Sequence, residues 1–110
     1  MYDPPKSKQY KQLVRSAAIP YAPKEPLEGP LEVRMTFYRQ NLKSFTKKQT
    51  QEAADGIYRP TTKPDTSNYI KGIEDALNGL MWKDDSQIVT LVAEKYYSDD
   101  PRVFVEVIEL

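Results

Sequence analysis

The chain has 110 residues, a length that allows one domain with a buried core and needs no disulfide or metal to hold it together. It contains neither cysteine nor histidine, which excludes disulfides, thiolate chemistry, imidazole zinc sites and histidine-based catalytic triads. The net charge is zero, but residues 1–64 carry twelve Lys or Arg against six Asp or Glu (+6), whereas residues 65–110 carry four against ten (−6). A basic half suits a polyanion and an acidic half suits a metal site, although uneven surface charge alone gives the same division. No apolar run approaches the roughly 20 residues of a membrane span and no signal peptide opens the chain, so we expect a cytoplasmic protein with no membrane contact.

The first thirty residues predict one helix between two irregular segments. Residues 1–6 hold two prolines and no periodic pattern, and we expect a loose lead-in. Ser7 is a candidate N-cap for an amphipathic helix over residues 8–18. Its apolar face would consist of Tyr10, Leu13, Val14 and Ala17. Residues 19–30 contain four prolines and are expected to form an extended connection.

A strand and a short helix are predicted next. Residues 31–38 alternate between apolar and polar side chains, which is typical of a strand with one buried face. Ser44 could cap a short helix over about residues 45–54, and Gly56 would end it. This region carries a local basic cluster of Lys43, Lys47 and Lys48. Such clusters are usually solvated surface, so this one gives only additional support to the binding of a polyanion.

The second half predicts a helix followed by two strands. Apolar residues at three- and four-residue steps predict a helix over residues 66–79, with Gly79 at its end. Residues 88–97 and 102–109 are rich in β-branched and aromatic residues, and the turn-like segment between them predicts a hairpin. A strand, helix and strand in succession favour a right-handed crossover and a parallel pair. We therefore expect a single α+β domain over residues 1–110, with a small mixed β-sheet and helices packed against it.

The segment of residues 63–87 gathers the side chains with the most chemistry. Asp65 precedes the predicted helix, Lys71 and Asp75 lie within it, and Asp84 and Asp85 follow it. Cleavage of a phosphodiester needs a deprotonated attacking oxygen and stabilised negative charge, and Mg²⁺ held by two to four carboxylates supplies both. A nearby lysine can stabilise the developing charge. The alternative is structural, with Asp65 as a helix cap, Lys71 and Asp75 as a surface ion pair, and Asp84 and Asp85 as turn residues.

The same segment resembles the RusA family of Holliday junction resolvases, metal-dependent endonucleases frequent in phages and prophages. The family pattern is close to K-P-D-x-D-N, a lysine, D-A-L-N-G and W-K-D-D-x-Q. This chain reads Lys63-Pro64-Asp65-Thr66-Ser67-Asn68, then Lys71, then Asp75-Ala76-Leu77-Asn78-Gly79, then Trp82-Lys83-Asp84-Asp85-Ser86-Gln87. Both the order and the spacing of the motif match.

The resemblance implies a small homodimer that cuts branched DNA at four-way junctions, in recombination and repair, with Mg²⁺ or Mn²⁺ as cofactor. The family's catalytic aspartates fall on Asp65 and Asp85, its lysine falls on Lys71, and Asp84 is a further candidate metal ligand. Two symmetric nicks also suit a two-fold dimer. The residues expected to contact DNA phosphates are Lys43, Lys47, Lys48, Arg59 and Lys63.

Two departures from the family pattern support a rival hypothesis. Ser67 stands where the family has its second aspartate, so the expected metal site loses a charge, with Asn68 and Asp75 as possible auxiliary residues. Family members usually have an opening strand before a Tyr-Asp-Pro sequence, whereas this chain starts at Met1-Tyr2-Asp3-Pro4, and we expect that strand to be missing. The rival is a weakly active or inactive protein that binds branched DNA or a protein partner.

Overall fold

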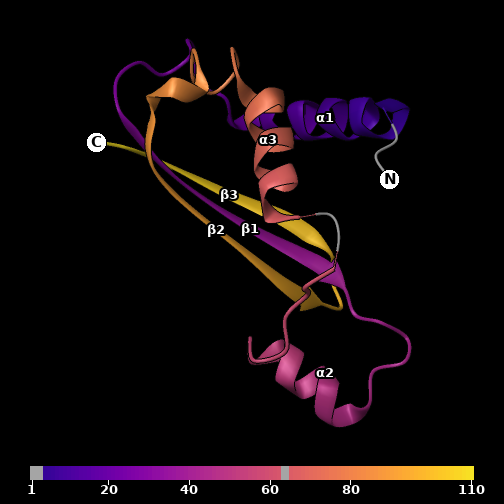
Figure 1. The fold of residues 1–110 in the computed structure, drawn as a ribbon. Coiled ribbons are helices and arrows are strands. Elements are labelled where there is room, and N and C mark those ends of the chain that lie inside the picture. Colours follow the sequence, from indigo (N-terminus) through magenta and orange to yellow (C-terminus); the bar gives the residue numbers. More distant parts are fainter. Residues whose placement is uncertain (1–3, 63–64) are drawn as a thin grey trace.

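A computed structural model describes residues 4–62 and 65–110 (Figure 1). In chain order the elements are α1 (Pro4–Ala18), a 3-10 turn η1 (Ile19–Tyr21), β1 (Leu31–Gln40), α2 (Lys47–Ala54), α3 (Thr66–Leu77), a second 3-10 turn η2 (Asp85–Gln87), β2 (Ile88–Ser98) and β3 (Arg102–Glu109). The expected α+β fold with a mixed sheet is confirmed. No helix in the described part of the chain has the length and apolar character to cross a membrane.

The three strands form one sheet in the order β2-β1-β3. β1 pairs with β2 in parallel and with β3 in antiparallel orientation. The parallel pair is the expected outcome of the strand–helix–strand unit, with α3 in the crossover. β1 lies at the centre because its inward side chains are the most completely buried of the sheet. These are Leu31, Val33, Met35 and Phe37, each at most 1% exposed.

The predicted hairpin of the last two strands is wrong. β3 returns antiparallel, as expected, but it pairs with β1 and not with β2, so that Phe37 lies opposite Val103. The segment of residues 99–101 carries the chain past the end of β1 to its other side. A turn signal predicts that the chain reverses direction, but not which strand the returning segment pairs with. With β1 in the middle, a neighbouring strand flanks its buried side chains on each side. The Asn41 N–H donates to Ser98 O at 3.0 Å and ties the end of β1 to this turn.

Helix boundaries differ from the predictions at two N-termini. α1 begins at Pro4, inside the expected lead-in, so Ser7 lies within the helix and does not cap it. Proline is compatible with the first helical turn because its fixed φ suits the helix and its missing N–H is not needed there. α2 begins two residues later than expected, because Thr46 rather than Ser44 is its N-cap and forms a reciprocal capping box with Gln49.

The end of α3 follows the prediction closely. Asn78 is its C-cap, and Gly79 follows with a φ of 80°, a conformation that favours glycine. The last carbonyls of the helix are also satisfied from outside, because the Arg15 guanidinium of α1 donates to Ala76 O at 3.1 Å and to Asn78 O at 3.2 Å. A cation at this position also complements the negative end of the helix dipole.

α1 and α3 pack together on one face of the sheet, whereas α2 lies beyond the ends of β1 and β2 (Figure 1). α1 contacts the core through Tyr10, Val14 and Ala18. Leu13, expected on the apolar face of this helix, is 70% exposed. α1 packs mainly against the single helix α3, so only a narrow i, i+4 stripe is covered and Leu13 lies outside it.

The opposite face of the sheet carries a row of stacked arginine and tyrosine side chains. The Arg59 guanidinium lies 4.2 Å from the Tyr96 ring centroid, Tyr96 stacks on Tyr38 at 5.8 Å, and Arg102 lies 3.8 Å over Tyr38. The row crosses all three strands near the C-terminal end of β1. Cation–π contacts of this kind give each pair up to roughly 1 kcal/mol at exposed sites, so the row helps to hold the sheet together where α1 and α3 do not cover it.

Candidate functional site

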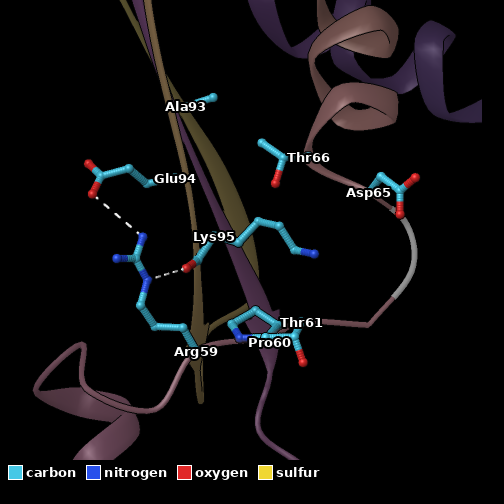
Figure 2. A pocket seen from close by; sticks show the side chains of 8 residues that line it. All are labelled: Arg59, Pro60, Thr61, Asp65, Thr66, Ala93, Glu94 and Lys95. Carbon is cyan, nitrogen blue, oxygen red and sulfur yellow. Dashed lines mark hydrogen bonds and ion pairs between the residues drawn. The ribbon is translucent and has the colours of Figure 1, made fainter.

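Asp65 lies at the start of α3, near the C-terminal ends of the parallel strands. It is the N-cap residue of the helix, but its side chain makes no capping hydrogen bond, and it is exposed. Its carboxylate therefore keeps its lone pairs for another partner. The residue lines an open pocket together with Arg59, Pro60, Thr61, Thr66, Ala93, Glu94 and Lys95 (Figure 2). Pockets at the carboxyl ends of parallel strands are frequent ligand sites in α/β proteins.

Two cations line this pocket, on different sides of β2 (Figure 2). Arg59 is engaged on the open face, where its Nε donates to Lys95 O at 2.9 Å and its Nη2 lies 3.5 Å from Glu94. The Lys95 side chain points to the side of Asp65 and is only 9% exposed as a residue. Its Nζ donates to Thr62 O at 2.9 Å. Sequence reasoning missed Lys95, although its place in the β2 alternation, between inward Ala93 and Tyr97, was a usable signal.

A second acidic group lies at the other end of α3. Asp84 is the N-cap of η2 and accepts a hydrogen bond from Ser86 N at 3.0 Å. Hydrogen bonds from Ser86 hold the pKa of the Asp84 carboxyl below its usual value. Asp85 is half-buried beside Glu74, a residue that the sequence did not single out. Burial raises the pKa of Glu74, and the charges of Asp85 and Asp75 raise it further.

Several motif residues near Asp84 and Asp85 stabilise the fold. The Trp82 side chain is fully buried, and its indole N–H donates to Asn78 Oδ1 at 2.6 Å. The Gln87 amide makes four hydrogen bonds: its Nε2 donates to Leu27 O and Gly29 O, and its Oε1 accepts from the N–H groups of Lys83 and Asp84. These bonds tie the start of β2 to the connection before β1.

The two acidic groups do not form one metal site within a single chain. Asp85 lies beside Glu74, which is nine residues along α3 from Asp65, a rise of about 14 Å along the helix axis. Among residues 4–62 and 65–110, no three acidic side chains come together in a group that could hold a metal ion. The donor chemistry of Asp65 and Asp85 suits a hard divalent cation, but one chain does not bring them to the same ion.

The remaining predicted site residues are distributed along the surface. Ser67, Asn68 and Lys71 are exposed on α3, and the positive charge of Lys71 acts against the raised pKa of Glu74. Asp75 pairs with Lys11 of α1, with 3.1 Å between Nζ and Oδ2, so its ion pair joins two helices. The basic cluster of Lys43, Lys47 and Lys48, which runs from the loop before α2 into its first turn, is exposed. Lys63 lies outside the described residues.

Comparison with known proteins gives a family match over almost the whole chain. The family described as "Endodeoxyribonuclease RusA" matches residues 1–108. A protein of Bacillus subtilis (strain 168), named "Uncharacterized protein YqaN", is 46% identical over 112 residues, which cover 100% of this chain and 79% of that protein. No solved structure matches the chain.

Proposed function

The chain belongs to the RusA endodeoxyribonuclease family, and we propose that it resolves four-way DNA junctions by paired nicks, as an endonuclease of recombination and repair in the cytoplasm. The observation that carries the proposal is the family match over residues 1–108, together with the K-P-D and W-K-D-D-x-Q elements at family spacing. The exposed carboxylate of Asp65, beside the pocket that Lys95 lines, adds chemical support.

The proposal includes a requirement for Mg²⁺, or Mn²⁺ in its place, with Asp65, Asp85 and Asp84 as ligands. When bound, such an ion lowers the pKa of its water and stabilises negative charge on the phosphate. Lys71 would contribute positive charge from the exposed face of α3. Because α3 separates the two acidic groups within one chain, the proposal also includes a homodimer, in which a second copy could bring its own carboxylates to Asp65. Two nicks placed symmetrically across a junction suit such a two-fold assembly.

DNA would contact the basic first half of the chain. Lys43, Lys47 and Lys48 are exposed, and α2 lies beyond the C-terminal ends of the parallel strands (Figure 1). The segment that follows α2 supplies Arg59, Pro60 and Thr61 to the Asp65 pocket. The contacts of the three lysines would be with phosphates, so junction affinity should fall steeply with salt concentration. Arg59 and Lys63 are the other two residues that we propose contact DNA, and in sequence Lys63 comes two positions before Asp65.

A synthetic four-way junction, labelled on each strand in turn, tests the proposal with Mg²⁺ or Mn²⁺ present. We expect symmetric nicks by the parent chain, and no cleavage of a linear duplex with the same sequence. Asp65→Asn should abolish cleavage and leave junction binding intact, because it removes a charge and keeps the shape. Asp99→Asn is the matched control, since Asp99 is an exposed aspartate in the turn before β3. Cleavage by Asp65→Asn at the parent rate would show that the proposed site is wrong.

A second candidate function, binding of branched DNA without cleavage, is favoured by Ser67. This serine is exposed in the first turn of α3, where the family pattern has an acid. The chain would then bind the junction at every Mg²⁺ concentration and never cut it. Ser67→Asp distinguishes the two candidates, and aspartate is well tolerated near a helix N-terminus. Cleavage that appears only in Ser67→Asp would mean that the scaffold is competent and the parent is a binding protein.

A further inference from the structure

We infer that Lys95 and Arg39 are positioning residues for Asp65: the two cations clamp Thr62 and so fix the start of α3. This inference rests on the proposed function for its consequence in catalysis, but its structural part stands without it. Lys95 Nζ donates to Thr62 O at 2.9 Å. Arg39 Nη1 donates to Thr62 Oγ1 at 2.8 Å and lies 3.4 Å from Thr62 O.

The two cations reach Thr62 from neighbouring strands. Lys95 is opposite Phe37 in the parallel register, and Arg39 is two residues beyond Phe37 on β1. All three positions therefore have the same parity and point to the face that α1 and α3 cover. Lys95 and Arg39 lie near the C-terminal ends of β2 and β1, where the chain must pass from the irregular segment after α2 into α3.

Lys95 occupies a position where an apolar residue would be the default. Its inward neighbours on β2 are Ala93 and Tyr97, and the residue is 9% exposed. Removing an ammonium group from water is unfavourable unless the protein supplies hydrogen bonds, and a buried charge adds little net stability even when it is paired. Core stability therefore does not account for a lysine at this position, and its hydrogen bond to Thr62 O gives it a role in placing that carbonyl.

Holding Thr62 restricts Asp65 through chain connectivity. Three peptide units separate the two residues, so their α-carbons lie at most about 11 Å apart. The connection between α2 and α3 covers residues 55–65 and contains no helix or strand in its described part. Connections of this length vary in conformation unless side chains anchor them. A misplacement of about 1 Å in a reacting group can lower a rate about a hundredfold, so an anchor three residues before a metal ligand has catalytic consequences.

The test combines amide hydrogen exchange with junction cleavage in Lys95→Met, which keeps the length of the side chain and removes its donor. We expect exchange in the first turn of α3 (residues 66–70) to accelerate about tenfold, while the last turn and the strands keep their protection. The cleavage rate at saturating junction should fall by about ten- to a hundredfold, with junction affinity nearly unchanged. Lys95→Arg should restore part of both, because it restores a donor. Lys24→Met, at an exposed position in the Pro-rich connection, is the control and should match the parent.

Arg39→Gln tests the other half of the clamp at a more exposed site, and should accelerate exchange in the same peptides to a smaller extent. Unchanged exchange over residues 66–70 in Lys95→Met would overturn the inference whatever the activity. Uniform acceleration over the whole chain would also overturn it, since Lys95 would then serve global stability alone. A parent chain that cuts no junction would refute the proposed function, and the exchange data alone would then decide whether the clamp exists.

Discussion

Replacing Gln87 by glutamate should lower the free energy of unfolding at neutral pH by about 2–3 kcal/mol. The Gln87 amide donates to Leu27 O at 2.9 Å and to Gly29 O at 3.0 Å, and accepts from Lys83 N and Asp84 N at 2.8 and 2.9 Å. Glutamate keeps the two accepted bonds but places a second oxygen against the two carbonyls. Two lost bonds contribute about 1 kcal/mol each, and the repulsion between oxygens adds up to about one more.

The loss of unfolding free energy in Gln87→Glu should depend on pH, because the new carboxyl group faces two carbonyl oxygens. The two carbonyls and the nearby Asp84 carboxylate disfavour the ionised form, and we expect them to outweigh the two N–H groups that favour it. The pKa of Glu at position 87 in the folded protein should therefore exceed the roughly 4.3 of the unfolded chain. A protonated carboxyl can donate to one carbonyl, so the destabilisation should be complete above the folded pKa and shrink as pH falls through it. Urea unfolding at pH 7.5 and 4.5, followed by Trp82 fluorescence, measures this.

Gln9→Glu is the control for this experiment, because Gln9 is exposed on α1 and the same chemical change should stay within about 0.5 kcal/mol there. If Gln87→Glu were as stable as the parent at pH 7.5, Gln87 would not join the two loops. A loss of equal size at both pH values would instead refute its role as a donor to the carbonyls.

Three further substitutions test the packing of α3 and its neighbours. Tyr10→Phe should raise the free energy of unfolding by about 1 kcal/mol and Tm by roughly 4–8 °C. The buried Tyr10 hydroxyl has no hydrogen-bond partner in the described structure, and burial raises its pKa to about 12. A lower Tm would contradict this prediction. Glu74→Gln should stabilise the chain at pH 7 but not near pH 4. The folded pKa of Glu74 is raised by burial and by Asp85, so the stability it contributes is present at low pH and lost as pH rises through that pKa; urea titrations at both pH values check the sign, and an equal effect at both would refute it. Gly72→Ala should raise the free energy of unfolding by about 0.5–1 kcal/mol, measured by thermal unfolding, because the helix no longer pays the entropy cost of glycine. The new Cβ would lie 3.5 Å from the Tyr10 ring, an ordinary contact. A lower free energy of unfolding would mean that α1 packs more tightly there.

Sequence patterns predicted the elements whose determinants are local. The alternation over residues 31–38 and the helical stripe over residues 66–79 each lie within one segment, and both elements formed close to those bounds. The pairing of β3 with β1 depends on which strand takes the central place, with a neighbouring strand at each of its two edges. Local signals in residues 98–101 do not contain that information. The exposure of Leu13 has the same origin, because it depends on how much of α1 its neighbours cover.

The site was predictable to a similar extent. Asp65 and Asp85 follow from the motif, but the approach of Glu74 to Asp85 requires knowing how the turn after α3 folds back. The alternation of β2 marks Lys95 as a cation at an inward position, but its partner Thr62 lies 33 positions earlier, and the sequence does not show that the two residues meet. Residues that act across elements become visible only when the elements are assembled.

The resemblance to the RusA pattern acquires a different meaning once the structural tasks of its residues are known. Trp82 fills the core and Gln87 joins two loops, so both would be required in a member of the family that had lost all activity. Asp65 and Asp85 differ from them. The side chain of Asp65 does not cap its helix, and the charge of Asp85 disfavours the ionised form of Glu74. The favourable interaction of the Asp65 carboxylate with the helix dipole contributes at most about 1 kcal/mol, and the charge of Asp85 adds repulsion towards Glu74. Folding therefore accounts for these two aspartates less well than for Trp82 and Gln87, which agrees with the catalytic role that we propose for them.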